Sequence, residues 1–278
     1  MAPLPTVPFG EVRITRLISG GNPLCANSHF SDEMSRDMRE YFTDQRVVEY
    51  LHRLEAAGIN ALQARGDYHR VLHWIELFRR EGGRLHWIAQ TASEMSDVFQ
   101  NIRILAAAGA VGIYHHGTRT DALWHEGQID RVGDYLKCIR DCGVRVGLGT
   151  HIPEVIEYAD EKGWDVDFHM ACVYDLSRKP RESALVAPAA AAAAGPEEFR
   201  DEDPPRMYET IRRTGRQCLA FKVLGAGRRC GTQADVRAAI AEAFANIKPA
   251  DAVVVGMFPK YADQIARNVQ YAVEACGE

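Results

Sequence analysis

Eight short apolar runs, each followed by an amphipathic stretch, most strongly limit how this chain can fold. The runs are ITRLIS (14–19), INALQ (59–63), LHWIA (85–89), AVGIY (110–114), VRVGLG (144–149), VDFHMACV (166–173), CLAFKVL (218–224) and AVVVGM (252–257). Parallel strands buried on both faces read as nearly continuous apolar segments, and each needs a crossover to reach the next strand. Eight such units predict an α/β protein with a closed (β/α)8 TIM barrel, in which residues 1–278 form a single domain.

Composition agrees with one enzyme-sized domain. The chain has 278 residues, of which 46% are hydrophobic and 26% charged. Its net charge of −5 provides no general attraction for nucleic acid or an anionic membrane. We find no 18-residue apolar stretch and no signal-peptide pattern, so we expect a cytoplasmic protein. The seven cysteines include no CxxC pair, which favours reduced thiols.

The longest irregular segment, 174–203, lies between the sixth apolar run and the helix after it. It begins with the basic sequence DLSRKPRE, passes through APAAAAAAG and ends with the acidic sequence PEEFRDEDPP. About 30 residues is far longer than a usual strand–helix connection, and such loops often act as lids. We therefore expect an insertion or lid here, with a purely decorative loop as the alternative.

Two histidines stand where neighbouring strands should end. His116 follows the fourth run and His151 the fifth, and adjacent strands lie about 4.8 Å apart. The pair could bind a divalent metal (Zn, Mn or Co), with His169 as the candidate third ligand, or divide acid and base roles. His115 and His29 are alternative third ligands. The other interpretation is that each histidine only satisfies a hydrogen bond in a polar cavity.

Lys222 interrupts an otherwise apolar run, and lysine is almost never fully buried without a partner. Facing the barrel lumen, it could form a Schiff base, stabilise an enolate or hold an anionic substrate. An ion-paired lysine at a strand end is the alternative. The first loop adds His29 and Asn22 as candidate catalytic residues, although Asn22 suits a turn equally well.

Loops after the last two strands of such barrels frequently bind phosphate. Gly225, Gly227, Arg228 and Lys260 occupy these loops and are candidate cofactor-binding residues. Basic Arg178, Lys179 and Arg181 of the insertion make an anionic substrate or cofactor plausible. Polar residues expected to look toward one cavity are Asn22, Gln63, Gln90, His116, His151, His169, Lys222 and Lys260.

The order of these features resembles the aldo-keto reductase superfamily. The similar segments, which cover most of the barrel, are ITRLISGGNPL (14–24), His116-Gly117 and VVVGMFPKYADQIARNVQYA (253–272). The resemblance implies a TIM barrel and NADPH-dependent reduction by an Asp, Tyr, Lys and His. His116 matches the family histidine, and Tyr68 suits the tyrosine. The lysine falls at Gln90 and the aspartate near Gln63, and glutamine cannot tune a phenol as lysine does.

Three functions therefore remain open. The favoured one is a lyase, isomerase or aldolase acting on a small polar carbonyl or sugar-like substrate, with strand-end histidines and Lys222. The second is a divergent NADPH-dependent reductase using Tyr68 and His116, with Lys260 and Arg228 near the cofactor phosphate. The third is a non-catalytic barrel that binds a partner. In the first two the partner is a small molecule, polar or anionic, and we expect neither nucleic acid nor membrane.

Overall fold

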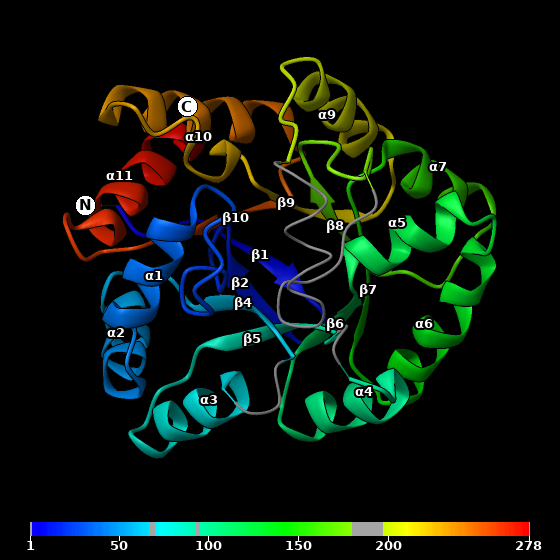
Figure 1. Cartoon of the computed structure of the whole chain (residues 1–278), viewed down its shortest axis with the longest axis horizontal. Coiled ribbons are helices and arrows are strands. Elements are labelled where there is room, and N and C mark those ends of the chain that lie inside the picture. Colours follow the sequence, from blue (N-terminus) through cyan, green and yellow to red (C-terminus); the bar gives the residue numbers. More distant parts are fainter. Residues whose placement is uncertain (1, 67–69, 93–94, 180–196, 278) are drawn as a thin grey trace.

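Each of the eight apolar runs overlaps one strand of a closed parallel barrel (Figure 1). The computed structural model describes residues 2–66, 70–92, 95–179 and 197–277. The strands are β3 (Leu17–Gly20), β4 (Ala61–Arg65), β5 (His86–Gln90), β6 (Gly112–His115), β7 (Arg145–Thr150), β8 (Phe168–Cys172), β9 (Gln217–Phe221) and β10 (Ala252–Gly256). Their order around the barrel is β10-β3-β4-β5-β6-β7-β8-β9. The predicted TIM barrel is confirmed.

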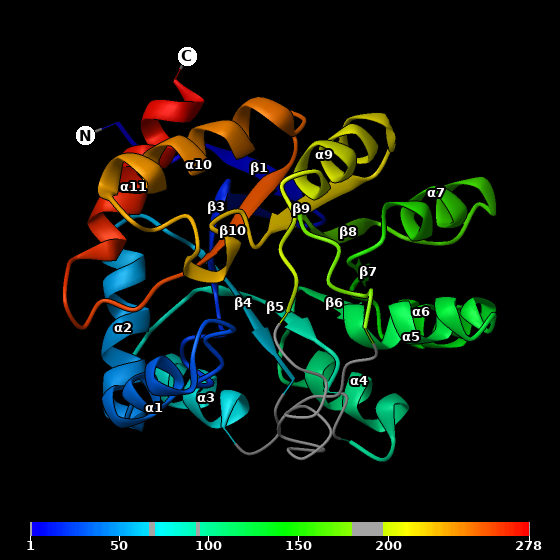
Figure 2. The same ribbon diagram turned by 45° about the horizontal axis from the view of Figure 1, so that its top comes forward.

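Helices surround this barrel and cover its outer face (Figures 1 and 2). They are α1 (Asp32–Tyr41), α2 (Asp44–Ala56), α3 (Val71–Arg80), α4 (Val98–Ala107), α5 (Gly117–His125), α6 (Val132–Asp141), α7 (Pro153–Glu161), α9 (Asp203–Arg213), α10 (Gln233–Asn246) and α11 (Gln264–Cys276), with 3-10 turns η1 (Ile129–Arg131) and η2 (Gly225–Gly227). Thr43 caps α2 as expected, since its side chain accepts a hydrogen bond from the Arg46 amide. None of the helices described is both long and apolar enough to span a membrane.

An antiparallel hairpin of β1 (Thr6–Phe9) and β2 (Val12–Thr15) closes the N-terminal end of the barrel. The Phe9 ring lies 5.0 Å from that of Phe168, at the start of β8, and the Arg145 guanidinium lies 4.6 Å from the Phe9 ring centre. Burying a phenylalanine side chain contributes about 2 kcal/mol. The hairpin therefore acts as a plug, and polar chemistry is left to the opposite, C-terminal end.

Alternation along each strand decides which side chains face the lumen. The buried cluster inside the barrel includes Ile18, Ala61, Ile88, Tyr114, Phe168, Met170, Leu219 and Val254. Because side chains of a strand alternate between its two faces, every second residue from these positions also points inward. The lumen side of β4 thus carries Gln63 and Arg65, and the lumen side of β8 carries Cys172.

Candidate active site

A lysine, a histidine and a glutamate meet at the C-terminal mouth of the barrel. Glu197 accepts a hydrogen bond from His29 Nδ1 at 2.7 Å, and its second oxygen lies 3.5 Å from Lys222 Nζ. The lysine nitrogen is also 3.5 Å from His29 Nδ1. The Lys222 side chain is only 8% exposed. Two residues predicted separately, His29 and Lys222, thus share one carboxylate, although 193 positions separate them in sequence.

The backbone of this cluster is unusual. Among the described residues, four non-glycine positions have a positive φ, and these are Ala26, His29, Lys222 and Ala226. All four lie in the first loop or in the loop after β9. Left-handed backbone at such residues costs about 1–3 kcal/mol each and concentrates at functional sites. At Lys222 it ends the alternation of β9 and turns the side chain toward the loops above the mouth.

Arg228 fixes the first loop against the loop after β9. Its Nη1 donates to the carbonyl of His29 at 3.1 Å and to that of Gly225 at 3.2 Å. Its guanidinium carbon lies 3.9 Å from the ring centre of Phe199. The arginine predicted to bind a phosphate therefore positions the His29 backbone and the end of the insertion that carries Glu197.

His151 belongs to a second polar cluster, at the end of β7. Its Nδ1 lies 2.6 Å from Asp121 Oδ2, and both side chains are buried. The other carboxylate oxygen of Asp121 accepts bonds from Thr150 Oγ1 at 2.6 Å and the His151 amide at 3.2 Å. Cys172, on the lumen side of β8, also acts on the charge of this imidazole. The imidazole orientation is therefore fixed by a carboxylate, as in acid–base histidines.

Electrostatics keep His151 charged. Burial by itself lowers the pKa of this imidazole, because a charged ring is poorly solvated inside the protein. The influence of Cys172 and the charge and hydrogen bond of Asp121 outweigh burial and raise the pKa of His151 to about 9. At neutral pH the imidazole is protonated, so it can donate a proton but must lose one before it can accept.

Three polar side chains form a hydrogen-bonded chain inside the lumen. Gln63 Nε2 donates to the Tyr114 hydroxyl at 2.7 Å, and this hydroxyl donates to Gln90 Oε1 at 3.0 Å. Tyr114 is buried, and burial raises the pKa of its phenol, while the charge of Arg65 opposes this rise. The prediction that Gln63 and Gln90 face the cavity is confirmed.

The predicted metal ligands do not assemble. His169 was expected in the lumen but faces the helices, where its Nε2 lies 3.7 Å from Asp160 on α7. This prediction was wrong because Phe168 and Met170 occupy the inner face of β8, so alternation turns His169 outward. Within the described ranges, no three His, Cys, Asp or Glu side chains gather as ligands. We derive no step through a metal.

His116 lies one residue before Gly117, which packs on His151. It follows β6, caps the start of α5, and its amide donates to Thr91 Oγ1 at 3.1 Å. A Cβ atom built on the next residue, Gly117, would lie 3.3 Å from His151 Cε1. The imidazole of His151 is thus packed against the turn that begins at His116, and the catalytic role of His116 stays a prediction.

Two glycine amides of the loop after β9 are already hydrogen-bonded within the loop. The amides of Gly225 and Gly227 donate to the carbonyls of Lys222 and Leu224, at 2.8 and 3.1 Å. Their N–H groups are therefore used within the loop, and a cofactor-binding role of these glycines stays a prediction. Lys260 is paired with Asp37 of α1, so its charge is offset as well.

The remaining candidates are placed as follows. Asn22 is exposed, and its carbonyl accepts bonds from the Cys25 and Asn27 amides, as a turn residue does. Tyr68 and Arg181 lie outside the described residues. Arg178 pairs with buried Asp203, and Lys179 lies 2.9 Å from Glu198. Arg178 and Lys179, the described basic residues of the insertion, are therefore each paired with an acidic residue near its other end.

Several site residues were not found from the sequence. Asp121 sits in the ordinary helical sequence GTRTDALWH and carries no local signal. Glu197 was read only as part of an acidic run. The spacing of two along a strand could have located Arg65 and Cys172. Arg65 lies two residues after Gln63, and Cys172 two residues after Met170, so each points to the same side of its strand.

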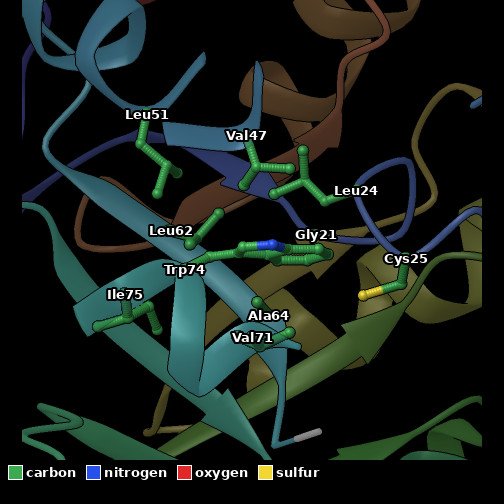
Figure 3. A pocket seen from close by; sticks show the side chains of 10 residues that line it. All are labelled: Gly21, Leu24, Cys25, Val47, Leu51, Leu62, Ala64, Val71, Trp74 and Ile75. Carbon is green, nitrogen blue, oxygen red and sulfur yellow. The ribbon is translucent and has the colours of Figure 1, made fainter. Parts of the chain in front are cut away.

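An apolar pocket lies elsewhere, between the outer face of β4, helices α2 and α3, and the first loop (Figure 3). Trp74 lies in it and donates from Nε1 to Asp44 at 2.6 Å. Its lining residues are Gly21, Leu24, Cys25, Val47, Leu51, Leu62, Ala64, Val71, Trp74 and Ile75. This space holds no titratable pair and is separate from the polar mouth. A smaller hollow beside His151 includes Asp175 and Arg206.

Comparison with known proteins supports the fold. No family model matches the chain, and neither does any curated protein sequence. A provisionally assigned aldo-keto reductase from Pseudomonas aeruginosa superposes with a TM-score of 0.59 at 18% identity, covering 97% of this chain and 94% of that one. A truncated 3-deoxy-D-arabino-heptulosonate 7-phosphate synthase from Thermotoga maritima gives 0.53 at 15% identity, with 98% and 90% covered.

Dihydropteroate synthase from Xanthomonas albilineans gives a TM-score of 0.51 at 15% identity, covering 98% of this chain and 96% of that one. The similarity to an aldo-keto reductase-like barrel is thus confirmed in fold. The identities are too low to carry an activity across, because unrelated chemistries share this barrel.

Proposed function

We propose that the protein is an enzyme that acts as a lyase or isomerase on a small polar carbonyl compound, with Lys222 as the catalytic residue. The observation that carries this proposal is the Lys222 cluster, in which a nearly buried amine is held beside Glu197 and His29 by left-handed backbone. The barrels with similar folds include synthases, which supports an enzymatic role in general.

The arrangement suits imine chemistry. Glu197 can take a proton from the Lys222 ammonium, and the neutral amine can then attack a carbonyl carbon. Glu197 returns its proton as the adduct loses water, which gives a protonated imine. In a lyase reaction the bond between the α-carbon and the hydroxyl-bearing carbon next to it then breaks: Glu197 takes the hydroxyl proton, that carbon leaves as an aldehyde, and the electron pair moves through the α-carbon to the imine nitrogen, which gives an enamine. Protonation of the α-carbon by Glu197 restores the imine, and hydrolysis returns the amine. His29 donates to Glu197 and so helps to hold the carboxylate in place.

His151 supplies the second function that such a reaction needs. Its imidazolium, backed by Asp121, can donate a proton to an oxygen that gains negative charge or leaves. Phe221, the residue before Lys222, lies against His151 with ring centres 5.8 Å apart. The two clusters therefore flank the same part of the mouth, across β7 to β9.

Borohydride trapping tests the proposal. We would incubate the protein with pyruvate, dihydroxyacetone, glycolaldehyde or D-ribose, add sodium borohydride, and locate adducts by peptide mass mapping. A reduced adduct on Lys222 is expected, and Lys222→Arg should abolish it. Lys260→Arg is the matched control, because Lys260 is a lysine of the same face paired with a carboxylate.

The Glu197→Gln variant separates the steps. Removing the proton acceptor should slow formation of the adduct at neutral pH, with partial recovery as the pH is raised and the amine loses its proton without help. Modification of surface lysines without any adduct on Lys222, for all four compounds, would refute the imine mechanism.

A further inference from the structure

The hydrogen-bonded row Gln63–Tyr114–Gln90 spans three consecutive barrel strands, β4, β5 and β6. Both glutamine side chains lie within 3.0 Å of one phenol oxygen. Tyr114 is buried, whereas both glutamines are half-buried. The outer amide atoms, Gln63 Oε1 and Gln90 Nε2, make no hydrogen bond with any other described residue, and neither is a fully buried atom, so both are open to solvent or a ligand.

Tyr114 determines which glutamine amide donates a hydrogen bond to it and which one accepts. A phenol has one proton, so in this chain it donates to one amide and accepts from the other. For either direction of these two hydrogen bonds, one glutamine keeps an unbonded oxygen and the other keeps an unbonded NH2 group. The lumen therefore presents one acceptor and one donor side by side, which matches the hydrogen-bonding needs of two neighbouring hydroxyl groups.

Arg65 adds charge beside this pair. It follows Gln63 by two residues on β4 and therefore points to the same side, and its Cα pairs in register with that of Gln90 on β5. A guanidinium binds carboxylates in preference to neutral groups because it offers several N–H donors in one plane.

We infer that Gln63 and Gln90 are specificity residues for a polyhydroxylated carbonyl substrate, a sugar or sugar acid, whose neighbouring hydroxyls bind the two free amide groups. Tyr114 acts as a positioning residue for both amides, and Arg65 favours the acid over the neutral sugar. The inference deepens the proposed function, on which it rests for placing the carbonyl end at Lys222.

Binding of compounds that cannot form an imine tests this subsite independently of Lys222. Ribitol and D-ribonate carry neighbouring hydroxyls but no ketone or aldehyde, and calorimetry measures their affinity. D-ribonate is expected to bind more tightly than ribitol, and Arg65→Gln should remove most of that difference. Gln63→Leu and Gln90→Leu should each weaken both ligands about tenfold, as loss of one hydrogen bond to a ligand does.

Tyr114→Phe should weaken binding several-fold although Tyr114 does not contact the ligand, because the amides are then free to rotate. Gln270→Leu, on the exposed face of α11, is the control and should bind as the unaltered protein does. In case a lumen variant does not fold, side-chain amide NMR signals of Gln63 and Gln90 in the unaltered protein should shift on addition of D-ribonate.

Unchanged affinities in both glutamine variants, or ribonate binding without shifts of these two amide signals, would overturn the inference. Failure of ribitol and D-ribonate to bind would do so too. Glutamine-dependent binding without borohydride trapping on Lys222 would instead refute only the imine mechanism. Trapping on Lys222 with polyol binding that ignores Gln63 and Gln90 would refute only the subsite.

Discussion

Replacing Asp121 by asparagine should change the charge of His151 with little change in shape. Asparagine keeps an oxygen that can accept from Thr150 Oγ1 and the His151 amide, but its NH2 group would face His151 Nδ1. His151 Nδ1 must then be unprotonated to accept from this NH2 group, and no carboxylate remains to stabilise the imidazolium. We expect the pKa of His151 to fall by at least one unit.

The magnitude follows from the environment of the imidazole. A pKa of about 9, against 6.5 for an ordinary histidine, corresponds to about 3 kcal/mol of preference for the protonated form. Because the folded pKa lies above the unfolded one, this stabilisation is complete below pH ~6.5 and is lost as the pH rises through about 9. Asp121→Asn should remove at least ~1.4 kcal/mol of it at low pH.

Proton NMR of the histidine ring signals, assigned with His151→Gln, measures the titration directly, and urea unfolding at pH 6 and pH 9.5 measures the stability. Asp160→Asn is the matched control, since it removes a carboxylate beside a different buried histidine, His169. It should leave the titration of His151 unchanged. Titration of His151 near 6.5 in the unaltered protein, or no response to Asp121→Asn, would refute the pairing.

Two further predictions concern stability and are read by urea unfolding. Gly147→Ala should destabilise the protein by about 1–3 kcal/mol, because the added Cβ would lie 2.4 Å from the Phe168 ring. The control Gly133→Ala lies in a helix with open space around it and should be neutral or stabilising. Equal changes in stability for the two variants would contradict this packing. Arg178→Gln should lower the free energy of unfolding by about 2 kcal/mol, because its buried carboxylate partner loses its ion pair. Lys179→Gln, in an exposed pair, should lower it by less than about 1 kcal/mol. A larger loss of stability in the lysine variant would contradict this reasoning.

The architecture could be predicted from local sequence patterns. A buried parallel strand appears in the sequence as a short apolar run followed by residues with helical periodicity. Eight such patterns predicted the barrel that the structure contains. The same reading placed Gln63, Gln90, His151 and Lys222 at or near strand ends, because the C-terminal end of every strand lies on one face. These inferences need only neighbouring residues.

Which way these residues face and which partners they have depends on how the whole chain packs. A strand buried on both sides is apolar throughout, so its sequence does not reveal which residues point inward, and His169 was misplaced for this reason. The carboxylates that give the site its character, Asp121 and Glu197, come from a helix and from the end of an insertion. Barrel closure and loop packing bring them to His151 and Lys222, and such long-range proximity leaves no mark on local sequence.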